Sequence, residues 1–146
     1  MLKPRHFLLA AVVTLALSAC ITAPEPTVSA VDSNGIEIPA WLDLAGTGHP
    51  ARDLTWVGET DLLVALSSRN NADEWCVVLA LKPAEGDPGV TTGSSCVSPA
   101  KFADQGVGIR IGNETVSGNA RIFPDGYTGP IEEGWVRVND NLAVRE

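Results

Sequence analysis

The sequence predicts a mainly β fold, a small antiparallel sheet or sandwich of about six or seven strands with one short helix and one disulfide. Its apolar segments are short and rich in β-branched residues, and turn-forming residues separate them. The chain has 146 residues, of which 45% are hydrophobic. That length and composition fit one globular domain and argue against wholesale disorder, a polytopic membrane protein and a two-domain enzyme.

The first half of the domain contains the most apolar segments. Residues 33–50 hold several glycines and prolines and are predicted to form an irregular entry segment, and residues 54–57 a short strand. Residues 62–67 and 75–81 are apolar on both faces, which is typical of central strands. Gly and Pro dominate residues 83–93, which are therefore predicted to be a surface loop.

One helix and four strands are predicted in the second half. Ser98 is a typical N-cap before a proline and Gly106 a typical stop, so residues 99–105 are predicted to be helical. Strands are predicted at residues 107–111, 119–123, 135–138 and 142–145. A three-residue loop at 139–141 is predicted to join the last two strands. That loop would pair Val136 with Val144, Arg137 with Ala143, and Val138 with Leu142.

Each of these four C-terminal strands contains one arginine. Each follows an apolar residue, so strand alternation directs the arginines away from the core. If the strands are neighbours in one sheet, they carry a basic face beside Trp135, which consists of Arg110, Arg121, Arg137 and Arg145. Guanidinium groups favour carboxylates and phosphates, so this face is a candidate site for an anionic envelope polymer or an acidic protein partner. The alternative is a solvated face whose arginines pair with Glu114, Glu132 or Glu133.

Residues 1–20 have the parts of a bacterial export signal. Lys3, Arg5 and His6 precede an uninterrupted apolar run at residues 7–17, which is too short to span a bilayer. The tetrad that follows, Leu17-Ser18-Ala19-Cys20, resembles the lipobox of bacterial lipoproteins. The resemblance implies diacylglyceryl transfer to the Cys20 thiol, cleavage before Cys20 and acylation of the new amino terminus.

This resemblance divides the chain into three parts. Residues 1–19 would be a removed signal peptide, residues 20–31 a flexible tether with prolines and small residues, and residues 32–146 a single β-rich extracytoplasmic domain. Two or three acyl chains hold a protein on a membrane durably. The expected location is therefore the extracytoplasmic face of the cell membrane, with the membrane as a partner through the lipid anchor.

The two remaining cysteines are predicted to form a disulfide. Cys76 and Cys96 are an even pair in a chain expected to be exported. The alternative is a pair of metal-ligating thiolates, but the sequence has no CxxC motif, and outside the signal its one histidine is His49. No metal site is predicted.

No motif in the sequence assigns a catalytic residue or a cofactor. His49 could act as a general base, but no nucleophile motif accompanies it. The net charge of −8 argues against nucleic acid as a partner. The predicted function is a non-enzymatic binding or interaction module of the cell envelope. The alternatives are an envelope-acting hydrolase or transferase, and a sensor or inhibitor ectodomain that contacts another membrane protein.

Short motifs across residues 52–146 are similar to those of small uncharacterised exported proteins of high-GC Gram-positive bacteria. They are a GETD turn, a CVV strand, a cysteine before a helix with a phenylalanine, a PDG turn and a closing GW strand. They lie at residues 58–61, 76–78, 96–102, 124–126 and 134–138. The resemblance implies a compact disulfide-bonded β domain and supplies no activity.

Overall fold

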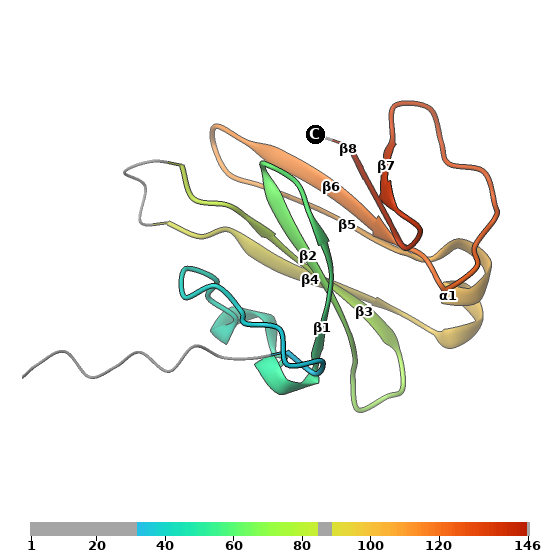
Figure 1. The fold of residues 1–146 in the computed structure, drawn as a ribbon, viewed down its shortest axis with the longest axis horizontal. Helices are drawn as coiled ribbons and strands as arrows, with labels where there is room; N and C mark the ends of the chain where they lie inside the picture. The colour runs from blue at the N-terminus through green and yellow to red at the C-terminus, as the bar shows by residue number, and fades with distance from the viewer. Residues whose placement is uncertain (1–31, 85–88, 146) are drawn as a thin grey trace, which may run out of the picture.

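Two antiparallel four-stranded sheets form the protein in a computed structural model that describes residues 32–84 and 89–145 (Figure 1). The first sheet has the order β1-β2-β3-β4 and is a simple meander. Its strands are β1 (Leu54–Glu59), β2 (Leu63–Arg69), β3 (Trp75–Leu81) and β4 (Thr92–Val97). The mainly β fold predicted from the sequence is confirmed.

A short helix leads the chain from the first sheet to the second. Helix α1 spans Pro99–Gln105, as predicted, and the Ser98 side chain caps it by accepting a hydrogen bond from the Lys101 backbone N–H at 3.5 Å. The second sheet has the order β5-β6-β8-β7. Its strands are β5 (Val107–Gly112), β6 (Ser117–Ile122), β7 (Val136–Asn139) and β8 (Leu142–Arg145).

The main hydrophobic core lies between the two sheets. Strands β2 and β3 direct leucine, valine and alanine side chains towards it, and β5, β6 and β8 face them from the second sheet. Phe102 of α1 closes one end and stacks on Trp75 with 4.6 Å between ring centres. The core residues include Leu63, Ala65, Val77, Leu79, Val107, Ala120, Ile122, Leu142 and Val144.

A second core lies on the other face of the first sheet. The segment before β1, which includes the 3-10 turns Ala45–Thr47 and Ala51–Asp53, runs beside this sheet (Figure 1). Its Ile38 and Leu42 pack in one cluster with Leu66 and Val78. The first sheet is therefore buried on both faces, which explains why β2 and β3 are apolar at successive positions.

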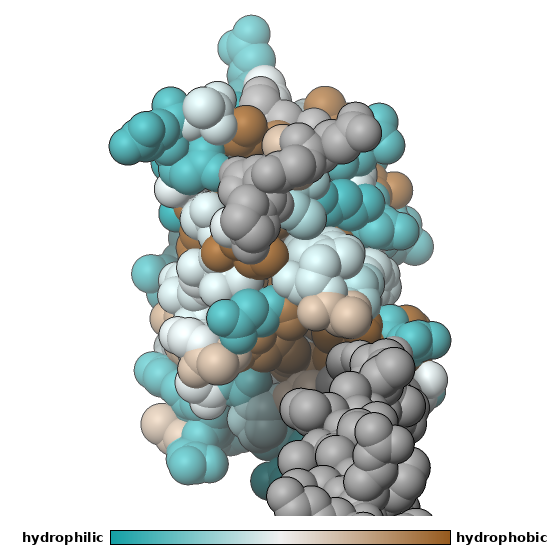
Figure 2. Space-filling model, turned by 90° about the vertical axis from the view of Figure 1, so that its left-hand side faces the viewer, coloured by the Kyte–Doolittle hydropathy of each residue, from teal (hydrophilic) through white to brown (hydrophobic). Residues whose placement is uncertain are grey.

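The surface of the described residues is largely polar. The large hydrophobic residues that are exposed there are Ile36, Val136 and Val138. Figure 2 shows one end of the molecule, where hydrophilic side chains cover most of the coloured surface and apolar ones lie in recesses between them. Two of the three exposed apolar residues belong to β7, the edge strand of the second sheet.

Two local features differ from the sequence prediction. Strand β4 was not predicted, because Gly93 and two serines give it little strand propensity, and its pairing with β3 aligns Cys96 with Cys76. The predicted three-residue loop at 139–141 and the predicted pair of Val138 with Leu142 are wrong, since a register shift pairs Asn139 with Leu142 and leaves a two-residue turn at 140–141. The shift lets the Asn139 side chain donate to the Val57 carbonyl at 2.8 Å, which links the two sheets. The other two predicted pairs of this hairpin are confirmed.

Candidate anion-binding site

The four arginines of the basic face all lie on one side of the second sheet. Arg121 and Arg137 are both paired with Ala143, so these two side chains share a face. Asn119 is paired with both Arg110 and Arg145 in the adjacent row. Because paired residues point to the same side of a sheet, the arginines occupy two neighbouring rows on the face opposite the main core.

Trp135 holds two of these arginines in place. The guanidinium carbons of Arg121 and Arg145 lie 5.2 and 5.3 Å from the centre of its ring, within cation–π distance. The ring is thus occupied by cations of the protein itself, which argues against Trp135 as a platform for stacking a sugar. Its indole Nε1 is buried and has no hydrogen-bond partner among the described residues.

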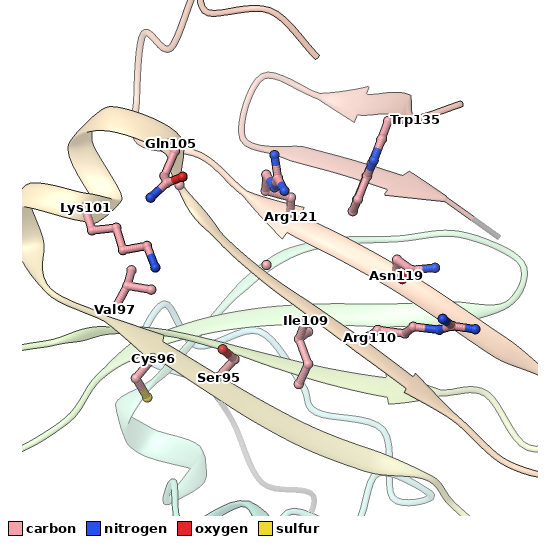
Figure 3. A pocket seen from close by; sticks show the side chains of 12 residues that line it. Ser95, Cys96, Val97, Lys101, Gln105, Ile109, Arg110, Asn119, Arg121 and Trp135 are labelled. Atoms are coloured by element: carbon pink, nitrogen blue, oxygen red, sulfur yellow. The ribbon is translucent and has the colours of Figure 1, made fainter. Parts of the chain in front are cut away.

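A pocket of about 420 Å³ opens beside this part of the basic face. It lies where strand β4, helix α1 and the outer face of β5 and β6 meet (Figure 3). Its charged lining residues are Lys101, Arg110 and Arg121, and no acidic residue lines it. We call this the basic pocket. Figure 3 shows Lys101 on one side of it, Arg110 on the other and Arg121 between them.

Gly108 lies in the lining of the basic pocket, directly opposite Arg121 in the register of β5 and β6. A Cβ atom there would lie 3.4 Å from the Arg121 Nε, which is ordinary contact. A Cβ atom therefore fits at this position without displacing its neighbours, and a larger side chain there would extend from the lining of the pocket. Sequence alternation found the arginines, but it gave no signal for this glycine.

Two of the three cations of the basic pocket have no ion-pair partner among the described residues. These are Lys101 and Arg110, whereas Arg121 pairs with Glu132 at 3.2 Å. Of the four arginines, Arg121 alone makes one of the ion pairs that the alternative predicts; the other three are exposed to solvent and have no ion-pair partner among the described residues. Glu132 is exposed at 63% of its side chain, and such surface pairs contribute about 0–1 kcal/mol, so an incoming anion can displace it.

The remaining two arginines of the basic face lie outside the basic pocket. Arg137 donates a hydrogen bond to the Asp140 carbonyl at 2.9 Å and lies 5.6 Å from the Phe123 ring centre. Arg145 makes the Trp135 contact described above. Lys101 was not predicted as a site residue. Nothing in the sequence indicates that helix α1 packs beside the second sheet and places this lysine in the pocket.

The predicted disulfide joins Cys76 and Cys96 on adjacent strands, and His49 lies next to it. One ligand atom from each of these three residues lies within 4.8 Å of the others. The sequence separates His49 from the cysteines, but the segment before β1 brings it onto the outer face of the first sheet. Both sulfur atoms are engaged in the disulfide, so the cluster offers no pair of thiolates to a metal.

His49 also makes a hydrogen bond of 2.8 Å between its Nδ1 and the Ser68 Oγ. A serine–histidine pair is the core of many hydrolase sites. Here Ser68 is only 4% exposed and lies beneath the covering segment, so a substrate carbonyl cannot reach its hydroxyl. We therefore treat this pair as part of the packing and assign it no chemistry.

A second pocket of about 340 Å³ opens at one end of the sandwich. Aromatic side chains from β1, β3, α1 and the end of β6 line it, namely Trp56, Trp75, Phe102 and Phe123. Asp125 is its one charged lining residue, and Asn141 donates a hydrogen bond to it at 2.9 Å. This pocket has no feature that selects an anion.

The chain matches no protein-family model, no curated protein and no solved structure. Within the part of the chain that the structure describes, no helix is long and apolar enough to cross a membrane. Cys20 and the ranges 1–19 and 20–31 lie outside the described residues.

Proposed function

We propose that this protein is a lipid-anchored binding module of the cell envelope, whose β domain binds an anionic ligand in the basic pocket. The observation that carries the proposal is the charge of the pocket. Three cations and no carboxylate line it, in a chain with eighteen acidic and ten basic residues. A concentration of positive charge on an acidic protein selects where an anion binds, because most of the remaining surface repels it.

The chemistry of the three side chains suits a compact anionic group. Arginine presents a planar fork of donors that matches carboxylate and phosphate oxygens, and lysine adds a point charge. In folded proteins, a hydrogen bond to a charged group contributes about 1.5–3 kcal/mol to stability. Two such bonds from Lys101 and Arg110 are enough for a weak to moderate affinity, which suits a module that meets a repeated ligand in the envelope.

The anchor part of the proposal rests on the lipobox-like tetrad that ends at Cys20. An acidic domain is repelled by the anionic headgroups of a bilayer, and the tether would hold it away from the surface. In that position the basic pocket is available to an anionic polymer of the envelope or to an acidic patch of another protein.

The proposal is tested by calorimetric titration of the full chain in detergent with inorganic phosphate, over a series of salt concentrations. We expect saturable binding that weakens as salt rises. The variant Lys101→Gln/Arg110→Gln should lose about tenfold or more in affinity, which corresponds to about 1.4 kcal/mol.

The matched control is Arg52→Gln, which removes an 84% exposed arginine in the segment before β1. It should change the affinity by less than about twofold, because Arg52 does not line the pocket. Equal losses in the control and in the pocket variant would show a non-specific charge effect and would overturn the proposal.

A further inference from the structure

The basic pocket contains neutral polar groups as well as cations. Ser95, Gln105 and Asn119 line it together with Lys101, Arg110 and Arg121. Neither the Ser95 hydroxyl nor the Gln105 amide makes a hydrogen bond with the described residues, and Asn119 uses only its Nδ2, which donates to the Arg145 carbonyl at 3.0 Å. The pocket therefore contains hydrogen-bond donors and acceptors that have no partner among the described residues.

The position of Ser95 is notable for a serine. It pairs with Val77, so it lies on the side of β4 that faces the main core, where an apolar residue would add to the packing. The edge of the first sheet opens there into the basic pocket, and the hydroxyl lies in its lining (Figure 3). A polar residue on the core side of a strand is explained if its hydroxyl serves a ligand.

The apolar part of the lining is small and aliphatic. Val97 and Ile109 supply it, and the Trp135 ring is already occupied by two guanidinium groups. A flat aromatic ligand would find no free ring to stack on, and an acyl chain would find too little apolar surface. A hydroxylated ring with an aliphatic C–H face fits this combination better.

We propose that the ligand of the basic pocket is an anionic carbohydrate, a sugar unit that carries a phosphate or a carboxylate. The inference rests on the proposed function. Lys101, Arg110 and Arg121 bind the anionic group, while Ser95, Gln105 and the Asn119 Oδ1 bind hydroxyl groups. The volume of about 420 Å³ lies in the range of about 300–1,000 Å³ that is usual for small-molecule sites.

The test compares ligands of the full chain in detergent by calorimetric titration. Glucose 6-phosphate should bind about tenfold more tightly than inorganic phosphate, and glucuronate about tenfold more tightly than acetate. The variant Ser95→Ala/Gln105→Ala should bind glucose 6-phosphate no more tightly than phosphate. Its affinity for phosphate should stay within about twofold of that of the natural sequence, because Lys101 and Arg110 are unchanged. Ser94→Ala is the matched control, since Ser94 lies on the opposite side of the same strand and contacts the Thr47 carbonyl.

The possible failures are distinguishable. If the sugar phosphate binds no more tightly than phosphate, the carbohydrate inference is overturned and the proposed function stands. If neither phosphate nor the sugar phosphate binds in a way that depends on Lys101 and Arg110, the carbohydrate inference and the proposed function are both overturned. Tighter binding of polyglutamate than of polygalacturonate of equal length would replace the carbohydrate by an acidic protein partner.

Discussion

The buried carboxylate of Asp32 joins the segment before β1 to strand β1 through hydrogen bonds. It is 4% exposed, and its Oδ1 accepts hydrogen bonds from the backbone N–H groups of Asn34 and Ile36 at 2.8 and 2.7 Å. Its Oδ2 accepts one from Trp56 of β1 at 2.9 Å. Burial alone would raise the pKa of this carboxyl, but the hydrogen bonds to its charged form outweigh burial and hold the pKa below its ordinary value of 3.8.

The lowered pKa of Asp32 predicts a specific dependence of stability on pH. A carboxyl whose pKa is lower in the folded protein stabilises it above the ordinary value of 3.8, and that contribution is lost as the pH falls through the folded pKa. Asp32→Asn should lower the free energy of unfolding by about 1–3 kcal/mol at neutral pH and make the acid side of the profile flatter. Urea unfolding at a series of pH values measures both effects.

Asp43→Asn is the control for this experiment, because Asp43 is exposed and accepts a single local hydrogen bond from Ala45. It should leave the profile nearly unchanged. An Asp32→Asn variant with the acid-side slope of the natural sequence would contradict the role of Asp32. No sequence pattern predicts this role, because Trp56 is 24 residues away and the contact depends on how the segment folds over the sheet.

Gly108 allows the basic pocket to be closed without a change in charge. Gly108→Val places a β-branched side chain on a strand, where it is favoured, and directs it into the space beside Arg121. We expect about a tenfold loss of phosphate affinity, measured by calorimetry, with a thermal midpoint within a few degrees of the natural sequence. Gly46→Val serves as the control, since Gly46 has open space around it and is outside the pocket. Unchanged affinity in Gly108→Val would place the anion elsewhere.

At the scale of elements, strand β4 is joined to its neighbour by a covalent bond as well as by backbone pairing. It is an edge strand with glycine and serine at half of its positions, and the Cys76–Cys96 disulfide joins it to β3. Three of its residues, Ser95, Cys96 and Val97, also line the basic pocket. The disulfide thus holds one wall of the candidate site.

Loss of this disulfide should weaken both the fold and the site. Cys76→Ser/Cys96→Ser is expected to lower the free energy of unfolding by about 3 kcal/mol, because the closed loop of about twenty residues is released in the unfolded chain. Phosphate affinity should fall with it, since β4 can move away from α1. Urea unfolding and calorimetry measure the two effects, and the reduced natural protein should behave as the variant does. A variant as stable as the oxidised protein would show that packing alone holds β4.

The sequence predicted those elements whose side-chain pattern is set by burial. Strands β2 and β3 were found because both faces are covered, and the strands of the second sheet because one face is open and alternates with arginine. Strand β4 was missed since its pairing comes from backbone bonds and the disulfide. The basic face was inferred from alternation, but the basic pocket was not, because it forms where α1 and β4 meet the second sheet.

At the scale of the whole molecule, the two sheets have different outer faces. The outer face of the first sheet is covered by the segment before β1, and that of the second carries the basic face and one wall of the pocket. The pocket is lined by cations and by no acidic residue, whereas the chain as a whole has a net charge of −8. A lipid anchor at Cys20 would place this arrangement next to the polymers of the envelope.

The anchor has its own prediction. Cells that express the protein and receive alkyne-labelled palmitate should label the natural chain, and Cys20→Ala should abolish the label and move the protein out of the membrane fraction. Cys76→Ser/Cys96→Ser should keep the label, which controls for expression of a cysteine variant. A labelled Cys20→Ala protein would rule out this residue as the attachment site.

The central claim is that an anion binds in the basic pocket, and an NMR titration of the ¹⁵N-labelled full chain with glucose 6-phosphate tests it most directly. The account predicts saturable chemical-shift changes that are largest around Lys101, Gly108, Arg110 and Arg121. In Lys101→Gln/Arg110→Gln the same changes should need about tenfold or more ligand. No saturable change, or changes centred on the second pocket around Trp56, Phe123 and Asn141, would contradict it.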